Sequence, residues 1–398
     1  MMHAIKITDK IYWVGALDWN LRDFHGYSTN HGTTYNAYLI LDKKTVLIDT
    51  VKAPFYEEML ARIKSIIDPK KIDIIISNHA EMDHSGSLPR AIKDFEPEKV
   101  YASTLGVQNL KAQLGQDLPV EAVANGSTLE IGEDSLTFLE SRMLHWPDSM
   151  VCLLNKANVL FSNDIFGMHY CSTARFEKDA NREDWIYEFH KYYANIVMPY
   201  SKVVSAFLKT VAQKGIAPKT ICPDHGLIWQ ESIKDIVEMY HDFALPKNKK
   251  KVVLVYDTMW GSTQKMAAAV VDGLVQAGVE VEQFSLHSEH RSDVVAEVLN
   301  SAGVIFGTPV MNLEIFPSLA DTMTYLKGLK KEGLVGAAFG SYGWAPSAID
   351  NLEKMMKDMK IEIVAPNVKC QFVPTEQKLK ECFELGLAVG KKVLEITK

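Results

Sequence analysis

The feature that most constrains this chain is a dense group of metal-binding side chains at residues 79–84. They follow an apolar run at residues 72–77, which has the length and composition of a buried β-strand. The ordinary alternative is a polar turn after a strand, but a turn has little use for so many ligand side chains at once. The pattern therefore predicts a metal site at a strand end, with these candidate ligands: His79, Glu81, Asp83 and His84.

The spacing of these residues favours two metal ions over one. Alternate side chains of an extended segment share a face, so we expect His79, Glu81 and Asp83 to converge. His84 would then point elsewhere, toward a second ion. Two ions that share one ligand-rich loop are the natural interpretation of neighbours that diverge.

Three further candidate ligands follow predicted strands downstream. His145 closes the apolar pattern at 135–144, Asp164 follows the second of two predicted strands within 150–162, and His225 follows a third apolar segment. A single His or Asp at a strand end is usually a turn or capping residue. Their recurrence after the first cluster favours the interpretation as metal ligands.

Length and composition indicate a globular protein with about two to three domains, since the chain has 398 residues, 47% of them hydrophobic and 23% charged. The net charge of −7 argues against nucleic-acid binding. Five cysteines without a Cys-x-x-Cys pair fit a reducing compartment and exclude a rubredoxin-like or zinc-ribbon module. The first residues lack an apolar signal core, and no apolar run reaches about 18 residues. We therefore expect a cytoplasmic protein without a membrane segment.

A domain boundary is predicted near residue 245. A proline and a lysine-rich run follow the helical pattern at 231–243, and a new strand pattern starts at 252. We expect domains at 1–245 and 252–398, joined by a linker at 246–251. The run is either a solvated connector or a docking patch for an acidic electron carrier. Its lysines are Lys247, Lys249, Lys250 and Lys251.

In the first domain the patterns predict strands, a hairpin, helices and one long loop. We expect a strand at 5–15, a loop without regular structure at 18–34, a hairpin at 35–51, and helices at 54–67, 87–94 and 104–113.

From residue 252, strand and helix patterns alternate, which predicts a five-stranded, doubly wound parallel sheet. Ligands of such sheets bind at the carboxyl ends of the strands. Three loops lie at such ends, after the first, third and fourth predicted strands. Their residues are Thr258, Met259, Trp260, Gly261, Ser262 and Thr263; Thr308, Pro309, Val310, Met311 and Asn312; and Gly340, Ser341, Tyr342, Gly343 and Trp344.

The first of these loops has the chemistry of a phosphate site. Hydroxyl groups and backbone N–H groups at a helix N-terminus can bind a phosphate without a cationic side chain. The loop is not a Walker loop, because no Lys follows a glycine-rich run, and it lacks the Gly-x-Gly-x-x-Gly dinucleotide fingerprint.

Taken together, these motifs resemble a known family. The seven candidate ligands are similar in order and spacing to those of the metallo-β-lactamase superfamily. The hydrolases of that superfamily usually have His where Glu81 stands, and Glu81 is similar instead to the flavodiiron proteins. The segments at 144–149, 192–196 and 225–229 resemble that family as well. The loop at 258–263 resembles the FMN phosphate loop of flavodoxins.

The resemblance implies a fold and a set of cofactors. It implies an α/β chain, with an N-terminal metallo-β-lactamase-like αββα sandwich and a flavodoxin-like doubly wound sheet of five parallel strands. It implies FMN, held by the three loops, with Trp260 and Trp344 as candidate stacking partners. It also implies two irons per chain. By the resemblance His79, Glu81 and His145 bind one iron, Asp83, His84 and His225 bind the other, and Asp164 bridges them.

The exchange of imidazole for carboxylate at position 81 agrees with redox chemistry. A redox centre must stabilise ions that gain positive charge on oxidation, and a carboxylate adds negative charge and a hard oxygen donor, which favours iron over zinc. Tyr193 and His25 match positions beside the bound gas in the family, although either could have a purely structural role.

The implied activity is that of a flavodiiron oxidoreductase. Electrons would pass from a soluble donor, such as rubredoxin or a reduced deazaflavin coenzyme, through FMN to the di-iron centre. That centre would reduce dioxygen to water, nitric oxide to nitrous oxide, or both. The implied assembly is a head-to-tail homodimer, and a dimer of dimers is compatible with it. The alternatives are a zinc-dependent hydrolase with a flavodoxin-like domain and a non-catalytic redox or gas sensor.

Overall fold

The computed structural model describes residues 2–245 and 248–398. The chain divides into two compact units that meet in sequence between His241 and Asp242, with the short segments 26–28 and 194–199 grouped with the second unit.

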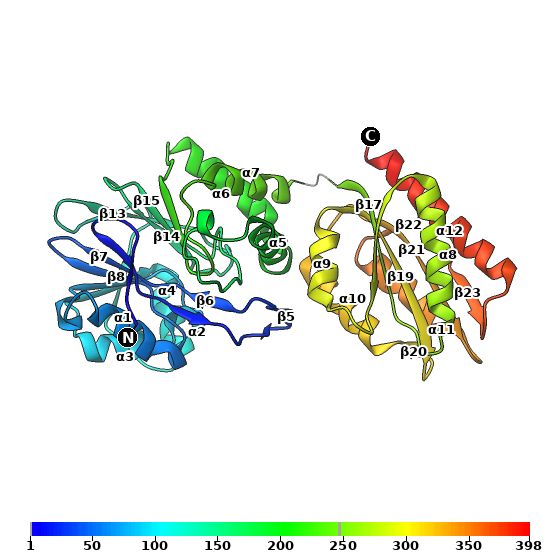
Figure 1. Ribbon diagram of the computed structural model, residues 1–398, viewed down its shortest axis with the longest axis horizontal. Coiled ribbons are helices and arrows are strands. Elements are labelled where there is room, and N and C mark those ends of the chain that lie inside the picture. The colour runs from blue at the N-terminus through cyan, green and yellow to red at the C-terminus, as the bar shows by residue number, and fades with distance from the viewer. Residues whose placement is uncertain (1, 246–247) are drawn as a thin grey trace. The chain divides into compact units, whose positions relative to one another are not determined.

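The first unit is built on two main β-sheets (Figure 1). The larger sheet has the order β1-β2-β7-β8-β9-β10-β11, antiparallel up to β8 and parallel from β8 to β11. Its strands are β1 (Ile5–Lys6), β2 (Ile11–Trp13), β7 (Tyr38–Leu41), β8 (Thr45–Ile48), β9 (Ile74–Ser77), β10 (Lys99–Ser103) and β11 (Val120–Val123). The smaller sheet contains, in this order, β12 (Thr128–Glu130), β13 (Ser135–Glu140), β14 (Met150–Leu154), β15 (Val159–Asn163) and β16 (Thr220–Pro223).

Helices lie outside the two sheets. A core between the sheets contains Trp13 and Ile40 from one sheet and Phe138 and Phe161 from the other. A second core lies between the larger sheet and its helices, and it includes Leu47, Ile75, Met59 and Leu88. These helices are α1 (Tyr56–Lys64), α3 (Leu88–Phe95) and α4 (Thr104–Leu114). Beside the smaller sheet lie α5 (Arg182–Tyr192), α6 (Ser201–Gln213) and α7 (Ile233–Ala244) (Figure 1). The αββα sandwich is confirmed.

The expected long loop at 18–34 is the main error in this unit. It contains short strands, and β3 pairs with β6 in a small sheet of its own. Two or three residues are too few to show a period of two, so the sequence pattern could not predict them. The short strands are β3 (Ala16–Asp18), β4 (Asp23–Phe24), β5 (Tyr27–Ser28) and β6 (Thr33–Tyr35), and the short helical segments are Ala53–Phe55, Pro69–Lys71, α2 (Met82–Ser85), Glu177–Asp179, Tyr193–Val197 and Met198–Tyr200.

The second unit is a doubly wound parallel sheet of order β18-β17-β19-β21-β22. Its strands are β17 (Lys249–Tyr256), β18 (Glu280–Ser285), β19 (Ser301–Met311), β21 (Val335–Tyr342) and β22 (Glu362–Ile363). The fifth strand expected at 361–372 is divided, since β23 (Val368–Gln371) also pairs with β21, and β20 (Glu314–Ile315) forms a hairpin with β19. The flavodoxin-like architecture is otherwise as expected.

Helices cover both faces of this sheet (Figure 1). On one face α8 and α12 pack so closely that only glycine fits at position 273. A Cβ at Gly273 would lie 2.0 Å from the carbonyl oxygen of Phe383. The core beneath them includes Leu254, Val270 and Val389. The helices of this unit are α8 (Ser262–Ala277), α9 (Arg291–Leu299), α10 (Pro317–Leu329), α11 (Ser347–Asp358) and α12 (Glu376–Ile396).

The linker differs from its prediction at its C-terminal end. β17 begins at Lys249, three residues before the expected start, so residues 249–251 belong to a strand. Lys251 is 6% exposed and forms ion pairs with Glu280, Glu282 and Glu297, so it is not part of a docking patch. Lys247 lies outside the described residues. The domain limits at 245 and 252 stay a prediction.

None of the helices in the described parts of the chain combines the length and the apolar character that a bilayer crossing requires.

Candidate metal centre and cofactor loops

The seven candidate ligands come together at one edge of the αββα sandwich. His79 and Glu81 lie in the loop after β9, and Asp83 and His84 lie on α2. The smaller sheet supplies the other three ligands from the loops that follow its strands: His145, Asp164 and His225. Both sheets therefore position the centre, and the ligands form two groups.

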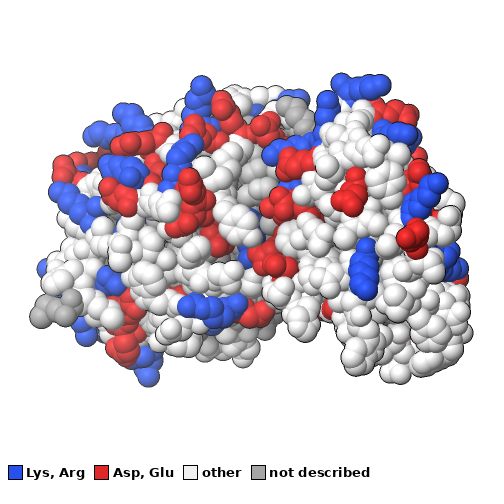
Figure 2. Space-filling view, turned by 45° about the vertical axis from the view of Figure 1, so that its right-hand side comes forward, with Lys and Arg blue, Asp and Glu red and all other residues white. Residues whose placement is uncertain are grey.

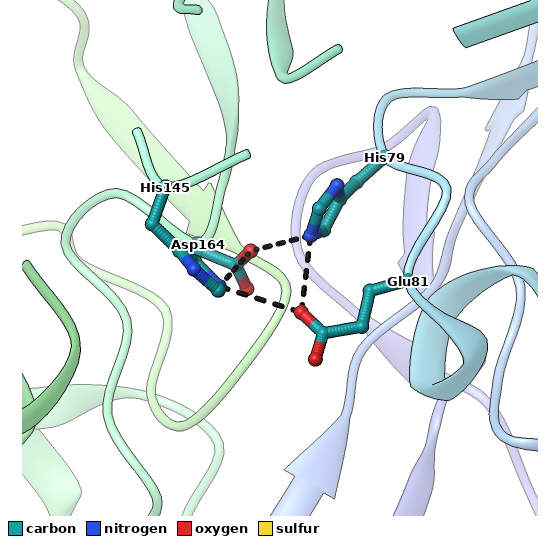
Figure 3. Close-up of side chains that lie close together, drawn as sticks. All are labelled: His79, Glu81, His145 and Asp164. Carbon is teal, nitrogen blue, oxygen red and sulfur yellow. Dashed lines mark hydrogen bonds and ion pairs between the residues drawn. The ribbon is translucent and has the colours of Figure 1, made fainter. Parts of the chain in front are cut away.

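The first group joins His79, Glu81, His145 and Asp164 (Figure 3). The Nε2 atom of His79 lies 3.2 Å from Glu81 Oε2 and 3.3 Å from Asp164 Oδ2. The Nε2 atom of His145 lies 3.4 Å from each of the same two oxygen atoms. Two imidazole nitrogens and two carboxylate oxygens thus surround one position.

The second group joins Asp83, His84 and His225. Oδ2 of Asp83 lies 3.5 Å from His84 Nε2 and 3.1 Å from His225 Nε2. Asp164 completes this group with its other oxygen atom, because Oδ1 lies 3.4 Å from His84 Nε2 and 3.7 Å from His225 Nε2. The carboxylate of Asp164 therefore faces both groups, one oxygen to each.

These separations are those of ligands around a metal ion. Two ligand atoms that each lie about 2.1 Å from one ion are about 3.0 Å apart at an octahedral angle and about 3.4 Å apart at a tetrahedral angle. The observed separations of 3.1–3.7 Å lie close to these values. The side chains already have the spacing that two metal ions require.

Unpartnered polar atoms also indicate metal binding. Both carboxylate oxygens of Asp83 and of Asp164, and both ring nitrogens of His84, are buried without a hydrogen-bond partner in the described structure. Buried ionised groups without partners cost several kcal/mol each, and coordination of a cation removes that cost. The donor set of carboxylates and imidazoles suits iron, as expected from Glu81.

The pKa values of the clustered side chains show that their carboxylates favour positive charge nearby. Burial alone would lower the pKa of His79, but the neighbouring carboxylates of Asp148, Glu81 and Asp164 raise it to about 10. Burial opposes ionisation of Asp164, yet the imidazole of His84, whose Nε2 lies 3.4 Å from Oδ1, holds its pKa well below the usual range. Metal ions that bind to such groups displace their protons.

Groups behind the ligands orient the imidazole rings. Nδ1 of His79 lies 3.7 Å from Asp148, and Nδ1 of His84 lies 3.9 Å from Asp224. Nδ1 of His225 lies 2.6 Å from the carbonyl oxygen of Thr34. A carbonyl oxygen only accepts, so this Nδ1 carries the proton of neutral His225 and leaves the Nε2 lone pair for a metal.

The expected convergence of Asp83 with His79 and Glu81 is wrong. The alternation argument assumed an extended backbone through residue 83, but Met82–Ser85 is helical. Because the chain turns at Met82, Asp83 lies with His84 and His225, which is the grouping that the resemblance implied.

His25 and Tyr193 lie in different surroundings. The side chain of His25 is 76% exposed, and its Nε2 lies 3.6 Å from Glu81 Oε1, the oxygen that does not face His79. Tyr193 is fully buried, and its hydroxyl lies 3.0 Å from Ser201 Oγ. The tyrosine rings of Tyr35 and Tyr192 lie beside the centre, with their centroids 6.0 and 6.3 Å from that of His225. The catalytic roles of His25 and Tyr193 stay predictions.

His169 is a residue that sequence reasoning missed. Its side chain is 1% exposed, and its ring centroid lies 4.7 Å from that of His225. Burial and the neighbouring His225 hold the pKa of His169 well below its ordinary value. Its position five residues after Asp164, in the same loop, was the available signal.

The loop at 258–263 connects β17 to α8 and presents the helix N-terminus. Gly261 has a φ of 81°, and its N–H donates to Thr258 Oγ1 over 3.0 Å. Thr263 is buried, with its hydroxyl 2.9 Å from Ser341 Oγ, so the first and third loops are in contact. Free N–H groups and hydroxyls at this helix end fit a phosphate group.

The other two loops surround the same strand ends. Thr308 is buried and accepts a hydrogen bond from the N–H of Phe316, while Asn312 has a φ of 53° in the β19–β20 turn. The side chains of Trp260 and Trp344 are 94% and 82% exposed. Exposed indole rings beside a phosphate-binding loop fit the stacking of a flavin ring. The roles of individual loop residues stay predictions.

Comparisons with known proteins agree with both halves of the chain. Residues 33–226 match the family described as ODP family beta lactamase, and residues 254–386 match the flavodoxin family. Over 99% of its length the chain is 42% identical to the whole of a nitric oxide reductase of Moorella thermoacetica. It is 40% identical to a coenzyme F420H(2) oxidase of Methanocaldococcus jannaschii, over 98% of this chain and 97% of that protein.

Solved structures show the same two-part architecture. The rubredoxin oxygen:oxidoreductase of Desulfovibrio gigas superimposes with a TM-score of 0.96, at 40% identity and 99% coverage of each chain. A flavodiiron protein of Giardia intestinalis superimposes with a TM-score of 0.93, at 30% identity, over 100% of this chain and 98% of that one. Fold, ligand groups and sequence identity lead to one conclusion: this chain belongs to the flavodiiron protein family.

Proposed function

We propose that this protein is a flavodiiron oxidoreductase that passes electrons from a soluble donor through FMN to two irons, where dioxygen or nitric oxide is reduced. The observation that carries the proposal is Asp164, whose two oxygens face two buried ligand groups in a chain that also has a flavodoxin-like unit. When bound, FMN supplies one electron at a time and the irons supply open positions for a diatomic gas.

The protein's own side chains set the charge of the centre. Three carboxylates, Glu81, Asp83 and Asp164, offset part of the charge of two ferrous ions and stabilise the more positive oxidised state. His25 lies where Glu81 faces solvent, so its imidazole can donate a hydrogen bond beside the gas. The carboxylates of Asp148 and Asp224 lie 3.7 and 3.9 Å behind the rings of His79 and His84 and favour their positive charge.

The hydrolase and sensor alternatives have less support. A zinc hydrolase of this fold would be expected to carry an imidazole where Glu81 stands, and the similar proteins have oxidoreductase names. A sensor would bind both cofactors but turn over slowly, and steady-state gas consumption separates that case.

The gas and the donor are further parts of the proposal. The similar proteins have names that include nitric oxide reductase, rubredoxin oxygen:oxidoreductase and coenzyme F420H(2) oxidase. We therefore propose either gas as substrate, and rubredoxin or a reduced deazaflavin coenzyme as donor.

Acidic and basic side chains are intermingled on the face shown in Figure 2. The five cysteines are free, which supports a cytoplasmic location for this chemistry.

We also propose a head-to-tail homodimer, in which the FMN of one subunit serves the iron centre of its partner. The support is the family membership together with the two separate compact units, each of which carries one cofactor site. A dimer of such dimers is compatible with this arrangement.

One experiment tests the function directly. The protein is analysed for metal and flavin, reduced without oxygen, and then titrated with dioxygen and with nitric oxide. We expect two irons and one FMN per chain and rapid reoxidation by at least one gas. Two zinc ions in protein that was produced with iron present, or slow reoxidation by both gases, would contradict the proposal.

A further inference from the structure

His169 lies against the second metal position without belonging to its ligand group. Its ring packs between Phe24 and Tyr192, with centroid distances of 4.6 and 5.2 Å, and against His225 at 4.7 Å. The side chain is 1% exposed, so it has one fixed place in the structure. A buried imidazole in this place requires a reason beyond filling space.

A threonine hydroxyl connects His169 to the ligand. Thr33 Oγ1 lies 2.8 Å from Nδ1 of His169 and 3.3 Å from Nδ1 of His225. Thr33 is fully buried on β6, and the next residue, Thr34, accepts the hydrogen bond from His225 through its carbonyl oxygen. One strand therefore holds His225 through two neighbouring oxygens, and His169 fixes one of them.

From this geometry we infer that His169 is a positioning residue for the metal ion bound by Asp83, His84 and His225. It acts through the Thr33 hydroxyl, which limits rotation of the His225 ring and keeps Nε2 directed at Asp83 and Asp164, 3.1 and 3.7 Å away. The other buried ligands His79 and His84 have carboxylates, Asp148 and Asp224, behind their Nδ1 atoms. His225 has a carbonyl and a histidine-bound hydroxyl instead. The inference rests on the proposed two-metal centre.

Variants at His169 and Thr33 can separate the contribution of hydrogen bonding from that of packing. His169→Phe keeps an aromatic ring but removes the bond to Thr33, whereas His169→Asn loses the ring and keeps a polar group near the position of Nδ1. Thr33→Val removes the hydroxyl at nearly constant volume, and Thr33→Ser restores it. If the Thr33 hydroxyl orients His225, the variants that lose the hydrogen bond will bind metal more weakly than the variants that keep it, whatever the shape of the side chain.

The test is metal binding by the full-length apoprotein, measured with Co²⁺ by visible absorption and with Fe²⁺ under anaerobic conditions. A His225→Ala variant identifies the binding step that belongs to the second position. We expect His169→Phe and Thr33→Val to weaken that step about tenfold and to leave the other step unchanged. His169→Asn and Thr33→Ser should remain close to the parent protein. The double variant, His169→Phe with Thr33→Val, should lose no more affinity at the second position than Thr33→Val alone, because both residues act through one hydroxyl.

Two results would overturn the inference. One is unchanged affinity at the second position in both His169→Phe and Thr33→Val. The other is an equal loss at both positions together with a lower melting temperature, which would make His169 a packing residue. Co²⁺ binding needs no gas reduction, so a protein that passes this test and reduces neither gas would refute the proposed function and leave the inference standing.

Discussion

At the scale of single residues, Glu81 is the ligand that we expect to set the metal preference of the centre. It is mostly buried, and one oxygen lies between His79 and His145. We predict that Glu81→His lowers the iron-to-zinc ratio several-fold and reduces gas consumption, because it replaces a charged hard donor by a neutral imidazole. Metal analysis of protein produced with both metals present checks this, with Arg142→Gln, at an exposed position in the turn after β13, as a control. An unchanged ratio would mean that residue 81 does not set the preference.

Asp164 should matter more for metal content than any other single ligand. Its two oxygens face different groups, whereas Asp83 contacts only one. We predict that Asp164→Ala retains less than one iron per chain, and that Asp83→Ala retains about one, because loss of one bridging ligand weakens both positions. Iron analysis after gel filtration measures both. Equal retention by the two variants would argue against a bridge.

The sequence predicted all seven members of the cluster, because ligand residue types recur at strand ends in a pattern that few structures need. It did not predict how Asp83 is directed, since that depends on a four-residue helix with no periodic signal. His169 was missed for another reason. A single histidine in a loop gives no sign of burial, and its contact with Thr33 joins residues 136 positions apart.

At the scale of elements, the ends of α8 offer a matched pair of glycines. Gly261 precedes the helix with a φ of 81° and Gly278 follows it with a φ of 87°, and a Cβ would meet no atom within 4 Å at either position. Alanine at either position should cost about 1–2 kcal/mol of strain. We predict that Gly261→Ala also weakens FMN binding at least tenfold, because it displaces the N–H groups at the phosphate loop, whereas Gly278→Ala does not. Fluorescence titration of the apoprotein with FMN measures this. Equal FMN affinity in both variants would exclude the loop from the site.

A buried lysine after α10 should make the second unit sensitive to pH. Burial lowers the pKa of Lys331 from 10.5 to about 8, and its ammonium donates to Asn248 Oδ1 over 2.7 Å. Between pH 8 and 10.5 the unfolded chain binds more protons than the folded protein, so stability rises with pH across this window. Below pH 8 Lys331 is charged in both states, and the full cost of burying its charge lowers the stability. The lowered pKa corresponds to a cost of about 3 kcal/mol in folding stability. Replacing Lys331 would remove this cost, but losing the hydrogen bond to Asn248 would offset about 1 kcal/mol of the gain.

Lys331→Met should therefore stabilise β17 and α10 by about 2 kcal/mol at pH 7, and the gain should disappear toward pH 10.5. The urea dependence of amide hydrogen exchange in these two elements gives the local free energy of opening. Lys330→Met, on the exposed neighbouring residue, is the control. A gain that does not change with pH would show that the ammonium is not desolvated.

Elements were predictable where they are long and periodic. The strands and helices after residue 252 follow the alternation closely, because the central strands β17, β19 and β21 are buried on both faces and the helices have one apolar side. The early start of β17 was hidden by its lysines, which read as linker. Lys251 lies inside because three glutamates from β18 and α9 neutralise it, and only the folded sheet brings these together.

At the scale of the whole molecule, two units carry two cofactor sites, and the sequence predicted this division from one proline, one charge run and a change of pattern. Sequence reasoning could not show which flavin serves which metal centre, because that depends on assembly between chains. The proposed head-to-tail dimer would bring the flavin of one subunit to the metal centre of its partner, and fast transfer requires the two cofactors to approach closely.

Transfer between subunits predicts that two inactive variants can restore each other. Asp164→Ala should lose iron, because it removes the group shared by both ligand sets, and Gly261→Trp should block the FMN phosphate loop. In a mixed dimer, the intact flavin of the Asp164→Ala chain would face the intact iron centre of its partner. We expect each variant alone to be inactive, and activity to return after subunit exchange, to at most about a quarter of the parent value. This ceiling follows because half of the dimers are mixed and each has one working pair. Gas consumption with a reduced donor measures it, while native mass spectrometry confirms the mixed dimers and shows that each variant retains its other cofactor. If transfer runs within each chain, no mixed dimer can work, so inactivity with confirmed mixed dimers would refute transfer between subunits.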